Sequence, residues 1–177
     1  KMFNFPLLGS PNWSLQVSTE LHMTNDKKYF HDAKIGPPLY KGEMIHMFTH
    51  TFAPPKQWLD QEEIENKFKK TALNKISKSI LKSNPQFTPQ INSQEFRLVW
   101  RIQSDADNTR SLITTILPPN VYLGNSLGFF VPLSFDGNKY VRTISNVETI
   151  FLCGLLNSFL LDFLIKRKIV RNVNNFH

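Results

Sequence analysis

The sequence contains very little cysteine. Cys153 is the only one among 177 residues, so no disulfide can form within the chain, and we expect a reducing compartment, the cytoplasm. One cysteine and five histidines without a paired spacing offer no four-ligand set for structural zinc. His46 and His50 lie four residues apart, but in an expected strand, and Asp105 and Asp107 are explained by a turn. We therefore expect no metal site.

Glycine is also scarce, and it is scattered. None of the seven glycines falls in a GxGxxG or GxxxxGK pattern, which removes the two common loops for dinucleotides and nucleoside triphosphates. No serine has the flanking glycines of a nucleophile elbow. The sequence therefore predicts neither a catalytic site nor a cofactor of its own. A stand-alone enzyme remains a third hypothesis, which turnover by the purified chain would support.

Long apolar runs are missing as well. The most apolar stretch, 149–164, is interrupted by Asn157, Ser158 and Asp162, so we expect no membrane span. Residue 1 is a lysine, no charged-then-apolar leader opens the sequence, and residues 172–177 are mostly polar. We therefore expect the chain to be an excerpt from a longer polypeptide.

Acidic residues are outnumbered by basic ones. The 21 Lys and Arg against 14 Asp and Glu give a net charge of +7. Such a balance favours a polyanionic partner, because clustered cations displace counterions from phosphates. The length and the 41% hydrophobic content suit one core. We expect a single domain over 1–177, with a lead-in at 1–38, strands and a helix over 39–135, and a hairpin and helix over 136–177.

Two main helices are expected. Between 60 and 82 apolar residues recur every four positions, and Asp60 can cap this helix. Lysines cover its other side, which either solvent exposure or phosphate contact explains. The stretch 149–164 carries two adjacent apolar rows, as core packing requires. Glu148 before it and the cations 166–168 after it match the helix dipole, and that cationic end could also hold a phosphate.

Strands and loops account for the remainder. Residues 96–102 alternate apolar and cationic side chains until Val99, so we expect one face to pack while Arg97 and Arg101 point outward together. Asp136 and Gly137 predict a hairpin. Other strands are expected at 39–52, 112–117, 127–135 and 139–142, and an exposed loop at 83–94. The fold class is α+β, with a curved, mostly antiparallel sheet.

Cations and amides lie at the expected strand ends and loops. Such side chains suit groove recognition, because Arg forks onto guanine, Asn onto adenine, and both onto phosphate. We expect Arg97, Arg101, Arg110, Lys139 and Arg142 on phosphates, and loop residues on base edges. For Arg101 and Arg110 the alternative is structural, bonding turn carbonyls and orienting Asn108. The full candidate set is Tyr40, Lys41, Arg97, Arg101, Asn108, Arg110, Asn125, Lys139 and Arg142.

Several phrases resemble one family in order. They read GPPLYKGEMIHMF (36–48), FRLVWRI (96–102), NTRSL (108–112), ILPP with GNS (116–126) and ETIFLCGLLNSF with DF (148–163). The ordered series is similar to the region downstream of the catalytic domain in large adenine-specific DNA methyltransferases. These include single-chain type II restriction enzymes with methyltransferase activity and their phage-defence relatives. The usual Asn-Glu-Arg-Thr turn here has Thr109 in its acidic position.

The resemblance implies a target-recognition role without catalysis. The family's Asn/Asp-Pro-Pro-Tyr/Phe motif and S-adenosylmethionine loop are absent, so no catalytic residue carries over. Double-stranded DNA and the methyltransferase domain of the same polypeptide are the implied partners. S-adenosylmethionine, methyl transfer and any endonuclease activity are expected elsewhere in that polypeptide, which would flip the target adenine. The alternative is a structural connector that braces the methyltransferase domain without touching DNA.

Overall fold

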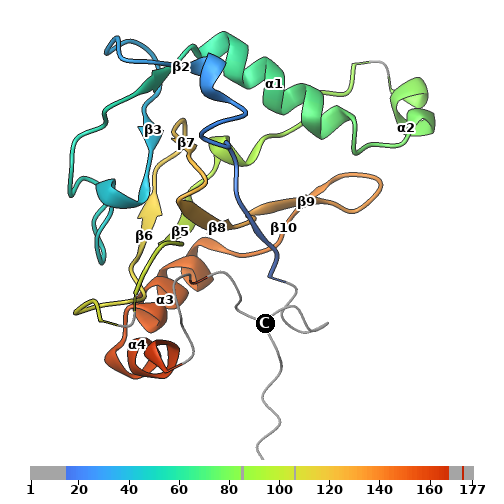
Figure 1. The fold of residues 1–177 in the computed structure, drawn as a ribbon. Helices are drawn as coiled ribbons and strands as arrows, with labels where there is room; N and C mark the ends of the chain where they lie inside the picture. Colours follow the sequence, from blue (N-terminus) through green and yellow to red (C-terminus); the bar gives the residue numbers. More distant parts are fainter. Residues whose placement is uncertain (1–14, 85, 106, 168–172, 174–177) are drawn as a thin grey trace, which may run out of the picture.

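The structure is a computed structural model that describes residues 15–84, 86–105, 107–167 and 173. Short strands and helices form an α+β fold, as expected (Figure 1). The expected lead-in before residue 15 and the chain end beyond 167 lie outside the described residues, apart from Val173. Within the described part, helices gather at two ends of a small central sheet.

The central sheet is antiparallel, with strand order β1-β8-β5-β6. Its strands are β1 (Val17–Ser18), β8 (Leu127–Phe130), β5 (Arg97–Arg101) and β6 (Thr114–Leu117). Trp100 lies opposite Gly128, and a Cβ at Gly128 would come within 2.3 Å of the indole ring. A glycine is therefore required where the ring crosses the neighbouring strand.

Three two-stranded pairs surround this sheet. One is parallel, between β3 (Leu39–Tyr40) and β7 (Tyr122–Leu123), so the fold is mostly but not wholly antiparallel. The others join β2 (Phe30–His31) to β4 (Trp58–Leu59), and β9 (Leu133–Phe135) to β10 (Tyr140–Arg142). The β9–β10 pair confirms the hairpin predicted at Asp136 and Gly137.

Each expected helix is broken into two. The first forms α1 (Gln61–Leu73) and α2 (Lys78–Ser83), and the second forms α3 (Asn146–Leu156) and α4 (Phe159–Lys166). Asp60 caps α1, as predicted, by accepting a hydrogen bond from the Glu63 amide. Ser158 caps α4 in the same way, so the chain turns by 62° between α3 and α4.

The strand predicted over 39–52 is wrong beyond Tyr40. A 3-10 turn, η2 (Gly42–Met44), follows at once, and His46 and Thr49 close a tight turn in which Phe48 has a φ of 62°. Met44 and Ile45 face the core from this turn, whereas Phe48 and Phe52 are exposed, so the apolar spacing here does not mark a strand. Similar short 3-10 turns, η1 (Lys27–Tyr29) and η3 (Asn92–Gln94), occur in the lead-in and at the end of the predicted loop.

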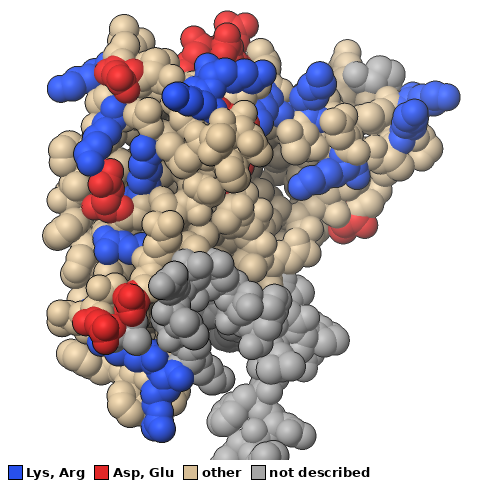
Figure 2. All heavy atoms as spheres, viewed as in Figure 1, with Lys and Arg blue, Asp and Glu red and all other residues tan. Residues whose placement is uncertain are grey.

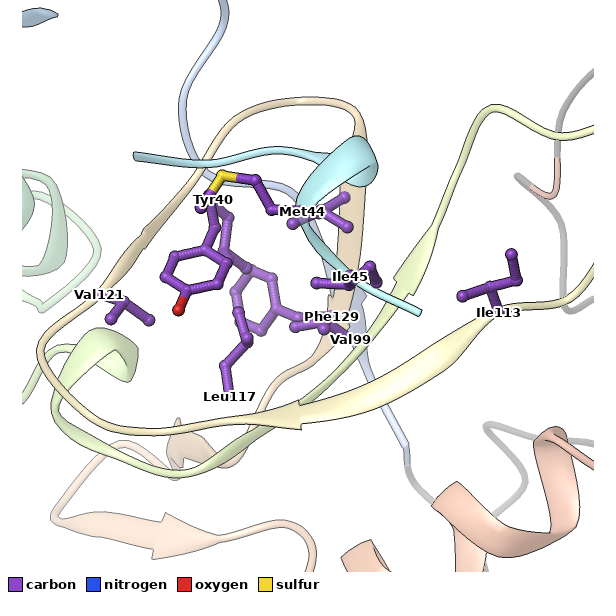
Figure 3. Close-up of a cluster of buried hydrophobic side chains, with 10 residues drawn as sticks. Tyr40, Met44, Ile45, Val99, Ile113, Leu117, Val121 and Phe129 are labelled. Carbon is purple, nitrogen blue, oxygen red and sulfur yellow. The ribbon is translucent and has the colours of Figure 1, made fainter. Parts of the chain in front are cut away.

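Apolar clusters cover both faces of the central sheet. The cluster in Figure 3 includes Val99 and Phe129 of the sheet, Tyr40 of β3, Met44 of η2 and Ile45, which directly follows η2. On the other face Leu98 and Trp100 pack with Leu152, Cys153 and Leu156 of α3. Strand β5 is therefore buried on both sides, and it offers no open face for its arginines.

Candidate nucleic-acid interface

A shallow groove brings together three of the residues predicted to bind DNA. It has a volume of about 400 Å³ and lies where η2, the end of β5 and the turn after β7 meet. Lys41, Arg101 and Asn125 are the three, and they come from segments far apart in the sequence. The groove is lined by Met23, Lys41, Gly42, Glu43, Arg101, Gln103, Asn125 and Ser126.

The floor of the groove is held by main-chain hydrogen bonds. Arg101 donates from Nε to the Gly42 carbonyl (2.9 Å) and from Nη2 to the Ile45 carbonyl (2.7 Å). The Gly42 amide donates to Ser126 Oγ (2.9 Å). A Cβ at Gly42 would lie 3.1 Å from Arg101 Cγ, closer than usual, so a larger residue here requires the arginine side chain to shift by a few tenths of an ångström. Burial lowers the pKa of Arg101, whose guanidinium acts here as a structural tie.

The mouth of the groove carries a cation and two amides. Asn125 and Gln103 are exposed, and within the described residues no hydrogen bond engages either side chain. Lys41 is half-buried and donates from Nζ to Gln57 Oε1 (2.8 Å). Glu43 pairs with an exposed lysine, Lys56, at 3.1 Å. The mouth therefore offers hydrogen-bond donors and acceptors above a fixed floor, as base-edge contacts require.

Gln103, Gly42 and Ser126 were not among the predicted site residues. Gln103 follows Arg101 by two positions, the spacing that places side chains on one side of a strand. That spacing was a usable signal for Gln103. The roles of Gly42 and Ser126 depend on a contact between segments 84 residues apart, which no local pattern encodes.

Arg97 does not point outward, so this prediction is wrong. Its side chain is fully buried, with Nη1 2.5 Å from Glu20 Oε1 and Nη2 2.5 Å from the Val121 carbonyl. Glu20 also accepts from the Leu123 amide at 2.8 Å. The pair links the lead-in to the sheet. It is buried because β5 is an inner strand with both of its faces covered. Arg97 therefore cannot contact phosphate in this fold.

Arg110 and Tyr40 are likewise engaged within the protein. Arg110 donates to the Asn157 carbonyl, lies 3.8 Å from the Asp162 carboxylate and packs over the Phe159 ring. This bonding supports the structural alternative for Arg110, as the carbonyl bonds do for Arg101. Tyr40 belongs to the core, with its hydroxyl 3.1 Å from His50 Nδ1, and burial raises its pKa.

The remaining predicted residues lie outside the groove. Asn108 is exposed, and its amide contacts Ser104 Oγ (3.4 Å) rather than either arginine. Lys139 is exposed in the β9–β10 turn, and Arg142 on β10 pairs with Glu95 at 2.5 Å. Four of the five cations predicted to contact phosphate therefore have partners within the protein, and Lys139 is the only one of the five without an ion pair or a bonded carbonyl in the described residues.

Lysines make a second basic region on α1 and α2. Figure 2 shows Lys and Arg side chains along this edge of the molecule, with acidic side chains among them. Lys67 pairs with Asp26 (2.5 Å) and Lys69 with Glu65 (3.0 Å). Exposed lysines here are Lys70 on α1, Lys75 in the turn between the two helices, and Lys78 and Lys82 on α2. Both explanations of the lysine face, solvation and phosphate contact, remain compatible with this exposure.

Potential metal ligands are dispersed in the described part of the chain. There, no three His, Cys, Asp or Glu side chains come together. The His46 ring instead packs on Phe52, with ring centroids 4.9 Å apart. No single described helix is long and apolar enough to cross a bilayer, although α3 and α4 together meet that length and composition across their bend.

Comparison with known proteins adds no family. No family model matches the sequence, and no curated protein matches it. The likeness to adenine-specific methyltransferases therefore remains a resemblance carried by the phrases within 36–163.

Proposed function

We propose that this chain is the DNA-contacting, target-recognition segment of a site-specific adenine-N6 DNA methyltransferase or restriction-modification enzyme of the cytoplasm. Methyl transfer, with S-adenosylmethionine, belongs to another part of the same polypeptide. The observation that carries the proposal is the groove at η2, where Lys41, Gln103 and Asn125 stand over a floor fixed by Arg101. The net charge of +7 supports a polyanionic partner.

Each group at the groove mouth has a distinct role in this proposal. Lys41 contacts a phosphate, as a compact positive charge on a flexible stem. Asn125 and Gln103 present amides that can donate to and accept from one base edge. Arg101 positions these groups without touching DNA, because its Nε and Nη2 donate to main-chain carbonyls. The fixed floor lowers the entropy lost on binding.

Substitutions at the groove mouth test this proposal. Asn125→Ala and Lys41→Ala in the 177-residue chain should each weaken binding to a fluorescein-labelled mixed-sequence duplex by about tenfold. Asn66→Ala and Lys34→Ala are matched controls, since both residues are exposed and outside the groove. Equal affinities for the wild type and both groove variants would contradict the proposed site.

A second candidate function is the structural connector, and one observation favours it. The outer sides of α3 and α4 expose apolar side chains, with Phe159 84% and Ile150 65% exposed. Folded monomers rarely expose apolar patches beyond a few hundred Å² unless a partner covers them. The complete set is Val147, Ile150, Phe151, Leu155, Phe159, Leu160, Phe163 and Leu164.

The connector makes its own prediction. Phe159→Asp and Ile150→Asp should leave this chain folded, because both side chains are exposed. In the full-length polypeptide they should increase protease cleavage between this segment and the remainder, without changing DNA affinity. Protection unchanged by either substitution would remove the support that the exposed apolar face gives to the connector.

A further inference from the structure

A second cleft lies apart from the groove at η2. It is bounded by α1, by the start of η3 and the residues just before it, by the β9–β10 hairpin and by β1. Its volume is about 460 Å³. In Figure 1, α1 and α2 lie above this hairpin. The cleft shares no lining residue with the groove. Its volume falls in the range of small-molecule sites.

Aromatic rings form much of the cleft wall. Phe68 comes from α1, Phe135 from β9 and Tyr140 from β10. Phe87 holds the two hairpin rings in place, with centroids 5.8 Å from Phe135 and 6.1 Å from Tyr140. Phe68 is fixed in turn by stacking on Tyr122, at 5.5 Å and 16°. The rings are therefore preorganised surfaces for a flat ligand.

The polar lining is almost entirely neutral. Gln16 and Gln90 are exposed amides, and the half-buried Asn92 accepts from the Leu133 amide through Oδ1 (3.3 Å). Lys75 is the single charged side chain among the described residues that line the cleft. Buried Ile76 and Ile91 supply an apolar floor. A ligand with one phosphate and one flat heterocycle suits this lining, because the single cation can bind the phosphate while the rings and amides bind the heterocycle.

We infer that this cleft binds an unstacked nucleobase of a single-stranded nucleic-acid segment, with Lys75 on the adjoining phosphate. A base offers its flat face only when it leaves the helical stack, so a duplex does not present this ligand. Rings bind its face with little sequence preference, and the amides bind its edge. The inference extends beyond the proposed function and does not depend on the groove at η2.

A short fluorescein-labelled single-stranded DNA, compared with a duplex of the same sequence, tests the cleft. Tyr140→Leu and Lys75→Glu should each weaken single-strand binding by about tenfold. Tyr140→Phe keeps the ring and should bind as the wild type does. Lys70→Glu makes the same charge change on α1 outside the cleft, and it should change the affinity much less.

Controls separate the cleft from folding and from the groove. Lys75 and Gln90 are exposed, so Lys75→Glu and Gln90→Ala keep the test valid if Tyr140→Leu unfolds the hairpin. No single-strand binding, or equal losses in Lys70→Glu and Lys75→Glu, would overturn the inference. Duplex binding that is sensitive to Asn125→Ala but accompanied by no single-strand binding would overturn the inference alone and leave the proposed function standing.

Discussion

At the scale of single residues, the arginine side chains are where the structure departs most from the sequence-based prediction. Alternation in 96–102 correctly predicted a strand, and it correctly placed Arg97 and Arg101 on one side of it. It could not predict that this side is covered, because the covering residues, such as Met44 and Ile45, come from a segment more than fifty positions earlier. Of the residues that line the groove, Lys41, Arg101 and Asn125 had been predicted from the sequence. For Arg101, a structural role was one of the two alternatives left open.

The buried pair of Glu20 and Arg97 should dominate local stability. Glu20→Gln leaves the guanidinium of Arg97 buried without its counter-charge, which should lower the free energy of unfolding by about 3–5 kcal/mol. Urea denaturation of the purified chain measures this loss. Glu95→Gln is the control, since its partner Arg142 is 40% exposed, and it should cost less than about 1 kcal/mol. Similar losses in both variants would contradict the burial of Arg97.

Asp26 should make stability depend on acid pH. Burial alone raises its pKa, but hydrogen bonds from Lys67 and the His22 amide outweigh burial, so the folded pKa lies below 3.8. A depressed folded pKa contributes stability above the unfolded value, and this contribution disappears as the pH falls through the folded pKa. Thermal melts of Lys67→Met against pH should show a weaker loss below about pH 4 than the wild type. Identical acid profiles would contradict this linkage.

At the scale of elements, the sequence predicted correctly those features that depend only on neighbouring residues. The hairpin turn, the cap at Asp60 and the strand at 96–102 depend on neighbouring residues, and the structure confirms them. The break between α3 and α4 combines the local cap at Ser158 with a contact to a distant segment. Asn157 interrupts α3–α4 because its side chain bonds to both main-chain groups of Thr114, 43 residues away, while the apolar spacing continues through the break. Periodicity alone therefore predicted one helix.

Asn157 should be essential for docking α3 on the sheet. Its Oδ1 accepts from the Thr114 amide (3.1 Å), and its Nδ2 donates to the Thr114 and Cys153 carbonyls (3.0 Å each). Asn157→Ala leaves buried groups unsatisfied and should cost about 2–3 kcal/mol of unfolding free energy. Exposed Asn66→Ala should change it by less than about 0.5 kcal/mol. Chemical denaturation of both variants makes the comparison, and equal stabilities would contradict the docking role.

Cys153 precedes Asn157 by four residues and lies on the side of α3 that packs on the sheet. The reactivity of its thiol should therefore report when α3 separates from the sheet. The thiol is buried, and desolvation raises its pKa, so little reactive thiolate exists at neutral pH. We expect slow alkylation of the native chain and rapid alkylation in denaturant. Asn157→Ala should increase the native rate, because it loosens α3 from β6. Fast alkylation of the folded wild type would contradict the packing of α3 on the sheet.

At the scale of the whole molecule, the α+β class was predictable, whereas the distribution of charge was not. Composition gives a net charge of +7 but not its location, and several cations expected at an interface are bound inside the protein. The groove at η2 and the lysine face of α1 and α2 remain accessible, as does Lys139 in the β9–β10 turn. These two regions support association with a polyanion in different ways, the first through shape and hydrogen bonding and the second through charge.

The most direct test of the proposed DNA binding at the groove is the salt dependence of duplex binding by the 177-residue chain. The logarithm of the association constant should fall linearly with the logarithm of salt concentration, as phosphate contacts release counterions. Lys41→Gln should reduce that slope by about one, whereas Lys34→Gln should leave it unchanged. An affinity independent of salt, an absence of binding even at low salt, or a slope unaffected by Lys41→Gln would contradict the account.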